Sequence, residues 1–197
     1  TTFPKPEVVY SSMDKFLREK CVNAGRGSYN LAQDATNLID ETRKQVLELV
    51  NATLDKKVIF SPSATIAINQ VLRGLEWNNI KNVYVSPFEH NAIMRTLHSL
   101  QKENEFNINI IPFDNMTFEL NKDDLRVMYS TKEPDLVIML HVSNVTGYIL
   151  PIKECHELGK KYNPINIVDC AQSLGVVKVD VKEDFSECDF IIFAGHK

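Results

Sequence analysis

The sequence lacks the features that mark several specialised classes of protein. Its 197 residues carry no basic excess, since 26 acidic residues outnumber 22 basic ones, and a nucleic-acid-binding domain would need a basic patch or stripe. It contains no uninterrupted apolar run of about 18 residues, which a transmembrane helix would require. These absences, together with 44% hydrophobic content, predict a globular unit with neither a nucleic-acid nor a membrane partner.

Cysteine is scarce and scattered. Cys21, Cys155, Cys170 and Cys188 form no CxxC pair, which indicates reduced thiols in a cytoplasmic protein rather than a disulfide framework. The first residues show no basic and apolar secretory signal, and the five histidines show no metal-ligand spacing, so no metal site is predicted. Cys21 and Cys155 fall in patterns typical of helices and the other two flank strands, so none is a good candidate nucleophile.

The sequence does contain a regular alternation of short apolar runs and helical patterns. Near-continuous apolar runs are typical of strands covered on both faces, as in a parallel sheet. Such runs occur at 56–61 (KKVIFS), 82–86, 106–113, 135–143, 165–169 and 189–194. Helical patterns occur at 31–50, 64–77, 90–103, 121–131 and 150–163. The alternation predicts an α/β layer sandwich, and in the helix at 31–50 the apolar stripe comprises Ala32, Ala35, Ile39, Thr42, Val46 and Leu49.

Ligands of such folds bind at the carboxyl ends of the strands, so the loops there are the places to look for chemistry. Ser63 and Thr65 open a helix after the run at 56–61, where they could bind a phosphate, or Ser63 could simply cap the helix. His90 stands at a helix entrance as a cap or as a ring that stacks on a planar ligand. Asn144 and Gly147 follow another strand, in a turn around a ligand or merely a turn.

Asp169, Gln172 and Lys197 suggest a particular ligand. Asp169 ends an apolar strand, where an ionised carboxylate is costly unless it has a cationic partner, and Gln172 would reach the same site if the chain turned into a helix. Lys197 follows the last strand, where apolar surroundings favour the neutral, nucleophilic amine. Lysine amines form Schiff bases with pyridoxal phosphate, whose sites carry an aspartate for the pyridinium nitrogen and a helix N-terminus for the phosphate. The sequence therefore predicts pyridoxal 5'-phosphate as cofactor.

Six motifs in order resemble one known family. TTFPKP, NAGRGSYNLA, FEHNAIMR, SNVTGYILPI, VDCAQSLG and AGHK are similar to successive motifs of the class V aminotransferases, and most of all to the cysteine desulfurase and selenocysteine lyase branch of the fold-type I enzymes. The resemblance covers essentially the whole chain. It implies a three-layer α/β sandwich with a mostly parallel sheet, the large domain of a pyridoxal-phosphate-dependent transferase.

The resemblance also implies roles around the cofactor ring. Lys197 matches the catalytic lysine that forms the Schiff base. Asp169 matches the aspartate on the pyridine nitrogen, and Gln172 matches the glutamine that donates to the phenolic oxygen. His90 matches the catalytic histidine that stacks on the ring.

Phosphate and substrate contacts follow from the same resemblance. Ala64 and Thr65 match the phosphate-binding turn, and His196 matches a further phosphate ligand. Asn144 matches the asparagine near the cofactor oxygen and the substrate carboxylate. Ala194 departs from the pattern, because many members have a serine or threonine there whose hydroxyl contacts the phosphate.

The function that the resemblance implies is removal of sulfur from L-cysteine, or of selenium from L-selenocysteine, to leave alanine, with a persulfide on a cysteine outside this sequence. Another class V activity, transamination or β-elimination, and a non-catalytic α/β binding domain are the alternatives. Residues 1–197 would be the N-terminal segment and most of the large domain, truncated at Lys197, with the rest of that domain and a small C-terminal domain absent. A homodimer and a sulfur-acceptor protein are the expected partners.

Overall fold

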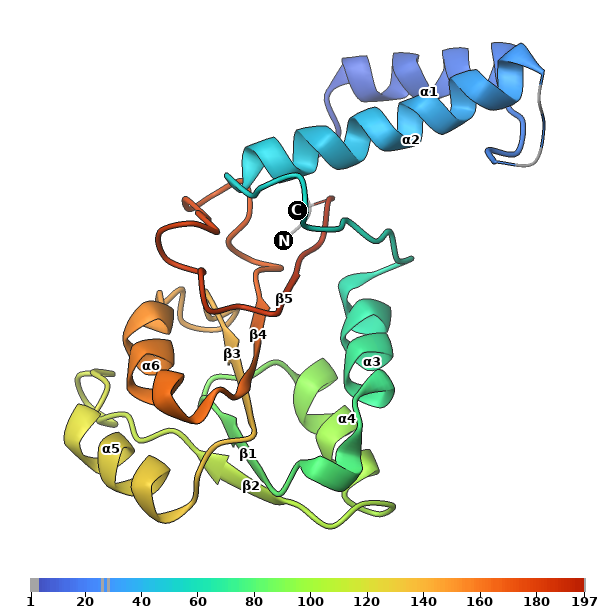
Figure 1. Cartoon of the computed structure of the whole chain (residues 1–197). Helices are drawn as coiled ribbons and strands as arrows, with labels where there is room; N and C mark the ends of the chain where they lie inside the picture. The colour runs from blue at the N-terminus through green and yellow to red at the C-terminus, as the bar shows by residue number, and fades with distance from the viewer. Residues whose placement is uncertain (1–3, 26, 28, 197) are drawn as a thin grey trace. The chain divides into compact units, whose positions relative to one another are not determined.

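The computed structural model describes residues 4–25, 27 and 29–196 (Figure 1). The chain divides into two compact units, one up to Ile59 together with His196 and the other from Phe60 to Gly195. The second unit contains the sheet, and the first contains two long helices. No helix within the described residues is long and apolar enough to cross a membrane.

The second unit is built on one parallel sheet. Among the described residues it has five strands in the order β2-β1-β3-β4-β5, and each neighbouring pair is parallel. Their bounds are β1 Asn82–Val85, β2 Asn107–Ile110, β3 Leu136–Leu140, β4 Ile165–Asp169 and β5 Phe190–Ile192. The five strands predicted from 82–86 onwards and their parallel arrangement are thereby confirmed.

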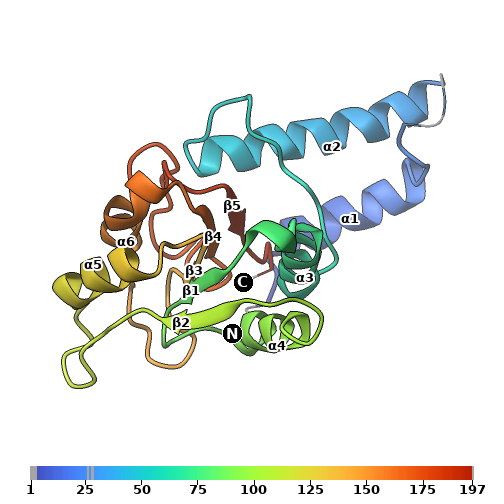
Figure 2. The same cartoon turned by 60° about the horizontal axis from the view of Figure 1, so that its bottom comes forward.

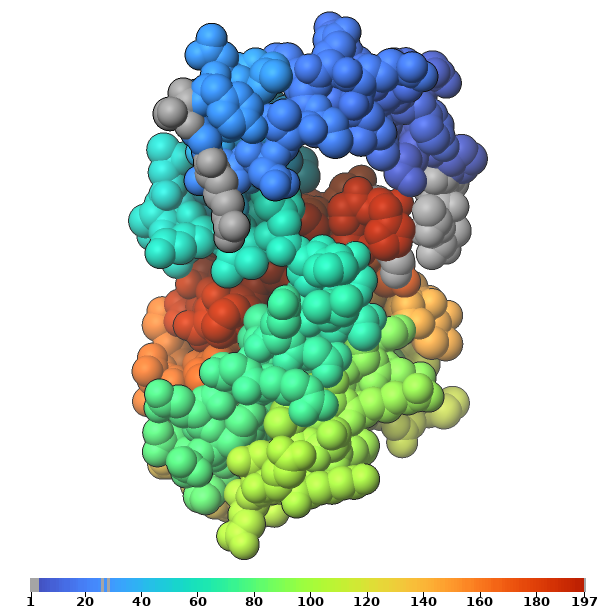
Figure 3. Space-filling view, turned by 90° about the vertical axis from the view of Figure 1, so that its right-hand side faces the viewer, coloured from blue at the N-terminus to red at the C-terminus, as the bar shows by residue number. Residues whose placement is uncertain are grey.

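Helices cover both faces of this sheet. Figures 1 and 2 show α3 and α4 on one face and α5 and α6 on the other, so the predicted three-layer α/β sandwich is confirmed. The space-filling view in Figure 3 faces the layer formed by α3 and α4. The bounds are α3 Ala64–Gly74, α4 Asn91–Leu100, α5 Lys122–Thr131 and α6 Ile152–Gly159, with short 3-10 helices η1 Trp77–Asn79 and η2 Lys160–Tyr162.

The burial of each strand follows from its place in the sheet. All five residues of the central β3 are buried, which is why its sequence is an unbroken apolar run. The edge strand β2 has no fully buried residue, and its Ile110 is exposed. On the α3 and α4 side, Val83, Val85 and Ile138 pack with Leu97 in a continuous apolar core. A core of this kind supports the strand ends that carry the candidate site.

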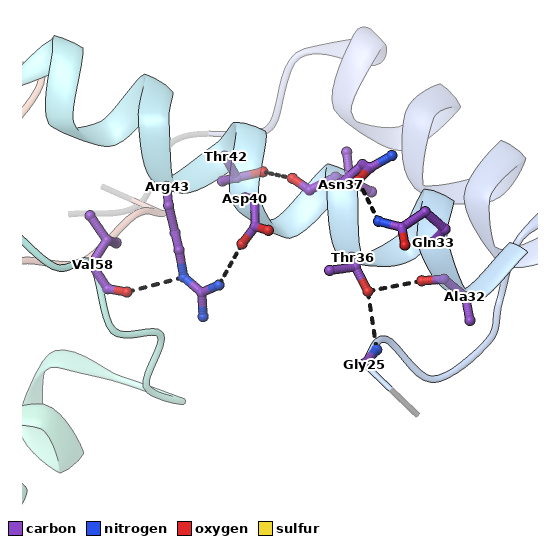
Figure 4. Close-up of polar contacts among 10 residues, drawn as sticks. Gly25, Ala32, Gln33, Thr36, Asn37, Asp40, Thr42, Arg43 and Val58 are labelled. Carbon is purple, nitrogen blue, oxygen red and sulfur yellow. Dashed lines mark hydrogen bonds and ion pairs between the residues drawn. The ribbon is translucent and has the colours of Figure 1, made fainter. Parts of the chain in front are cut away.

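The run at 56–61 does not form the predicted strand. Residues 57–61 have no regular secondary structure, and Ile59 is 83% exposed. The carbonyl of Val58 accepts a hydrogen bond from Arg43 Nε at 3.2 Å, and Arg43 is held in turn by Asp40 at 2.9 Å (Figure 4). The prediction here was wrong, and a side chain of the preceding helix, not a neighbouring strand, binds this carbonyl.

The first unit contains α1 Glu7–Glu19 and α2 Asn30–Leu49. The helix predicted at 31–50 is confirmed, and Ala32 and Ala35 of its stripe are buried. Leu49, however, is 62% exposed while Leu47 is buried, so the predicted stripe is wrong at its C-terminal end. Leu49 is the last residue of the helix, so no following helical residue supports the spacing from which its burial was predicted.

Polar contacts connect α2 to the segment before it. Lys20 forms an ion pair with Asp34 at 2.8 Å, and the backbone N–H of Gly25 donates to Thr36 Oγ1 at 3.1 Å (Figure 4). Gly25 has a φ of +78°, which glycine adopts without strain. Cys21 is exposed and lies after α1, not in a helix as predicted, because α1 ends at Glu19.

Candidate functional site

The carboxyl ends of the strands form one edge of the sheet, and the predicted site residues of this unit follow them. Leu140, Asp169 and Ile192 are register partners across β3, β4 and β5. The pairing continues one residue further, since the His141 N–H donates to the Asp169 carbonyl at 2.9 Å and the Cys170 N–H donates to the Ile192 carbonyl at 2.6 Å. The loops after these strands therefore start side by side, as the parallel arrangement requires.

Asp169 is the last residue of β4 and is only 7% exposed. Its Oδ1 accepts a hydrogen bond from the backbone N–H of Ala171 at 2.8 Å, which fixes the carboxyl group at the strand end. Gln172 is half-buried in the hydrogen-bonded turn that follows. The sequence interpretation required the chain to turn into a helix here, and it does not. Instead, the Leu174 N–H donates to the Cys170 carbonyl at 3.1 Å and closes one tight turn.

His90 is the N-cap of α4. Its Nδ1 accepts a hydrogen bond from the backbone N–H of Ala92 at 3.1 Å, so the proton of the neutral ring is on Nε2. The capping alternative is confirmed. It does not exclude stacking, because a capped ring is held in a defined orientation and His90 as a residue remains exposed.

The N-terminus of α3 has the form of an anion site. Ser63 Oγ accepts from the Ile66 N–H at 3.2 Å, so Ser63 caps the helix as one of the sequence alternatives had it. A helix leaves its first N–H groups without intrahelical partners, and those of Ala64 and Thr65 precede the group that Ser63 satisfies. Ala64 is half-buried and Thr65 is exposed, so the first turn can bind a phosphate from solvent.

Asn144 is exposed at a tight turn after β3. Ser143 Oγ accepts from the N–H groups of Val145 and Thr146 at 3.3 and 3.2 Å. Gly147 closes the turn with a φ of +73° and donates its N–H to the Ser143 carbonyl at 2.9 Å. The turn thus has its own hydrogen bonds, and they do not use the amide of Asn144, which stays available to a ligand.

The segment after β5 is described only in part. Ala194 is half-buried and offers no hydroxyl, and His196 is exposed. Lys197, the predicted Schiff-base lysine, lies outside the described residues. The structure therefore brings together the loops after β1, β3 and β4 as predicted, while the assignment of Lys197 stays a prediction.

Sequence reasoning missed Glu89, the residue before His90. Its Oε1 accepts hydrogen bonds from Ser86 Oγ at 2.5 Å and from the Leu140 N–H at 2.9 Å, so it connects the loop after β1 to the end of β3. Burial raises the pKa of Glu89 to about 8, and the charge of Asp169 adds to the rise, while the bonds from Ser86 and Leu140 act against it. An acidic residue only four positions after the end of an apolar strand was the signal available.

Three cysteines of this unit are not activated as nucleophiles. Burial raises the pKa of Cys170 and of Cys155 to about 12, and it raises the pKa of Cys188 as well. Thiolates are the nucleophilic form, so these three cysteines are poor nucleophiles. Within the described residues, no group of three or more His, Cys, Asp and Glu side chains is arranged to hold a metal ion.

Together, the polar groups described above suit a flat cationic ring that bears a phosphate. A positively charged neighbour stabilises a buried carboxylate, and Asp169 is buried at the end of a strand. A capped imidazole offers a face to a ring, and the first turn of α3 offers N–H groups to an anion. This set fits pyridoxal phosphate.

Known proteins are similar to this chain in both sequence and fold. The family model described as aminotransferase class-V matches residues 1–197. A probable cysteine desulfurase of Methanothermobacter thermautotrophicus is 30% identical over 197 residues, which cover 100% of this chain and 48% of that protein. A probable cysteine desulfurase of Pyrococcus abyssi is 33% identical over 197 residues, covering 98% of this chain and 47% of that protein.

Among solved structures, the apo structure of cysteine desulfurase from Thermococcus onnurineus NA1 has a TM-score of 0.88 at 29% identity, covering 100% of this chain and 48% of that chain. The chain thus spans about half the length of the curated relatives it matches.

Proposed function

Because this chain belongs to the class V aminotransferase family, we propose that the full-length protein is a pyridoxal-phosphate enzyme that removes sulfur from L-cysteine and leaves alanine. The observation that supports the proposal most is the buried carboxyl of Asp169 at the end of β4, next to the strand β3 that the Asn144 loop follows. The similarity to proteins named cysteine desulfurases favours cysteine among small amino acids. L-Selenocysteine has the same carbon skeleton and is the second expected substrate.

Pyridoxal phosphate, when bound, supplies an electron sink for charge that develops at the α-carbon of the substrate. Asp169 would keep the ring nitrogen protonated, since a buried carboxylate favours a cationic neighbour. His90 would stack on the ring, and Gln172 would donate to the phenolic oxygen. The first turn of α3, with the hydroxyl of Thr65, would bind the phosphate together with His196.

Lys197 and Asn144 would act on the substrate. Lys197, once released by the substrate amine, would move the proton at the α-carbon, because a neutral lysine is a competent base. Asn144 would hold the substrate carboxylate through its side-chain amide, which has no hydrogen bond to another described residue. Both roles follow from the family resemblance and from their places after β5 and β3.

We place the persulfide-forming cysteine outside these residues because the family resemblance implies it, and the raised pKa values of Cys170 and Cys155 support this. On this proposal residues 1–197 supply the N-terminal segment and most of the large domain. The rest of that domain and a small domain complete the protein, which works as a homodimer and passes sulfur to an acceptor protein. The described cysteines are unpaired, which suits a reducing compartment such as the cytoplasm.

The test uses the full-length protein with added pyridoxal phosphate, L-cysteine and a thiol reductant such as dithiothreitol, which supplies the two electrons that release the persulfide sulfur as sulfide. Equal amounts of alanine and sulfide, with a visible absorption band of bound cofactor, are the expected result. The Lys197→Ala variant should lose the borohydride-reducible link to the cofactor. Amino-group exchange with a keto acid would instead show a transaminase, and the absence of any cofactor band would show a binding domain without this chemistry.

A further inference from the structure

Glu89 connects two strand ends through one of its carboxyl oxygens. Oε1 accepts from Ser86 Oγ at 2.5 Å and from the Leu140 N–H at 2.9 Å, and Ser86 Oγ in turn accepts from the Phe88 N–H at 3.2 Å. Oε2 is inaccessible to solvent and has no hydrogen-bond partner within the described part of the chain. Two donors therefore meet one oxygen, and none meets the other.

This asymmetry fits a neutral carboxylic acid better than a carboxylate. A carboxylate shares its charge between both oxygens, and leaving one of them buried without a donor costs much of its solvation energy. A neutral acid has a carbonyl oxygen that accepts and a hydroxyl that carries the proton. In a neutral Glu89, Oε1 would be the carbonyl oxygen and Oε2 the hydroxyl.

The surroundings of Glu89 favour the same state. The charge that acts on it comes from Asp169 on β4, and two carboxyl groups at one buried site do not both ionise readily. His90 follows Glu89 on the same turn, and His141 follows Leu140, whose N–H donates to Glu89. Burial lowers the pKa of His141, so this ring is neutral and brings no positive charge. Burial also raises the pKa of Glu89 to about 8.

The turn that carries Glu89 is packed as well as hydrogen-bonded. The Phe88 ring lies 5.4 Å from Phe113, 5.6 Å from Phe118 and 5.7 Å from Tyr148, centroid to centroid. These rings anchor one side of the turn, and Glu89 anchors the other side to β3. His90 follows directly and begins α4, so its ring position depends on both anchors.

We propose that Glu89 is a positioning residue, held as a neutral carboxylic acid, that fixes His90 and the turn after β1 against the end of β3 while the negative charge of the site rests on Asp169. This inference rests on the proposed function as far as the cofactor is concerned. A neutral Glu89 leaves Asp169 as the counter-charge of the pyridinium ring, and it does so without a second carboxylate competing for the same proton.

The first experiment compares Glu89→Gln and Glu89→Ala in the full-length protein. Gln has a carbonyl oxygen for Ser86 and Leu140 and a neutral group in place of the hydroxyl, so pyridoxal phosphate should bind within about threefold of wild type. Ala removes both hydrogen bonds, so binding should weaken by about tenfold or more. The circular dichroism of the bound cofactor, which reports how the ring is held, should change in the Ala variant only.

The second experiment measures Tm against pH for wild type and Glu89→Gln, with and without pyridoxal phosphate. A folded-state pKa above the unfolded value means that the folded protein keeps a proton that the unfolded chain has released, so the stability of wild type falls as pH rises from about 4.5 to about 8. Gln cannot lose this proton. The Tm of Glu89→Gln should therefore rise relative to wild type, by several degrees, across this range.

Ser86→Ala is the matched variant, because it removes one donor to Oε1 and leaves the carboxyl in place. The Tm of Ser86→Ala should fall with rising pH as that of wild type does, so the difference in Tm between Ser86→Ala and Glu89→Gln should still depend on pH. Parallel Tm curves for wild type and Glu89→Gln, or cofactor binding as weak in Gln as in Ala, would overturn the inference. If wild type binds no pyridoxal phosphate, the proposed function fails, while the Tm curves of the unloaded protein still decide the state of Glu89.

Discussion

The two ends of the sheet use carboxyl groups in the same way but with different consequences. At the amino ends of the strands, Asp135 Oδ2 accepts from the N–H groups of Lys81 and Asn82, each at 2.8 Å. At the carboxyl ends, Glu89 Oε1 accepts from the N–H of Leu140 at 2.9 Å. Both groups join neighbouring strands and both residues are half-buried, but Oε2 of Glu89 is inaccessible to solvent.

A strand-joining carboxyl group is therefore not in itself a sign of function. Asp189 also accepts a strand N–H, that of Asn166 at 2.8 Å, and it is exposed. What distinguishes the carboxyl end is burial, because only a desolvated carboxyl has a strongly altered proton affinity or a need for a cationic partner. Asp169 is 7% exposed and Oε2 of Glu89 is inaccessible to solvent, so both groups meet that condition.

The largest expected effect tests this difference directly. In the full-length enzyme, Asp169→Asn should retain cofactor but lower kcat by about 100-fold or more, because a neutral amide does not stabilise the pyridinium proton when charge develops. Asp189→Asn, at the opposite end of β5, is the control and should leave kcat unchanged. Steady-state kinetics and the absorption band of the cofactor check both. Near-normal turnover in Asp169→Asn would make this carboxyl structural, like Asp189.

A buried histidine on the helix α6 should make the protein sensitive to acid. His156 is 2% exposed, and burial lowers its pKa to about 4. The unfolded chain binds a proton near pH 6.5 and the folded one near pH 4, so stability present above pH 6.5 is lost as pH falls toward 4. The loss is on the order of 3 kcal/mol.

The His156→Phe variant should remove this part of the pH dependence. Urea unfolding at pH 7 and at pH 4.5 measures it, with the exposed His98→Gln as control. The distance between His156 Nδ1 and Cys188 Sγ is 3.8 Å. An unchanged slope of stability against pH would mean that His156 is already charged in the folded protein.

Loss of the carboxyl at the amino end should affect stability alone. Asp135→Ala removes the acceptor of two backbone N–H groups and should cost about 1–3 kcal/mol of unfolding free energy. Pyridoxal phosphate affinity and kcat should stay at wild-type values. The midpoint of urea unfolding measures the loss of stability, and a cofactor titration measures the affinity for pyridoxal phosphate. A change in cofactor affinity would mean that the two ends are coupled.

The smallest expected effects come from two tyrosine hydroxyls between β1 and α5. Tyr84 donates to the Lys132 carbonyl at 2.7 Å, whereas the buried Tyr129 hydroxyl has no partner within the residues that the structure describes. Tyr84→Phe should cost about 1 kcal/mol, and Tyr129→Phe should be neutral or slightly stabilising. Chemical unfolding of both variants tests this pair, and equal losses would contradict it.

Much of the fold could be predicted, because it follows from local patterns. The unbroken apolar run of β3 indicated a strand covered on both faces, and the three- and four-residue spacing of α2 indicated a helix. Asp169 and His90 could be placed at strand and helix ends because parallel strands send all their carboxyl ends to one edge. The same local reasoning failed at 56–61, where an apolar run forms no strand and the carbonyl of Val58 binds Arg43 instead of a neighbouring strand.

The sequence by itself therefore determined the alternation of strands and helices, the family, and which loops carry the candidate site residues. These depend on periodicity and on motifs that are contiguous along the chain. Only the tertiary structure decided that Leu47 rather than Leu49 is buried and that Glu89 belongs to the site. Burial and the proton affinity of a carboxyl depend on groups that meet only when the chain folds, as Glu89 and Leu140 do across 51 positions of sequence.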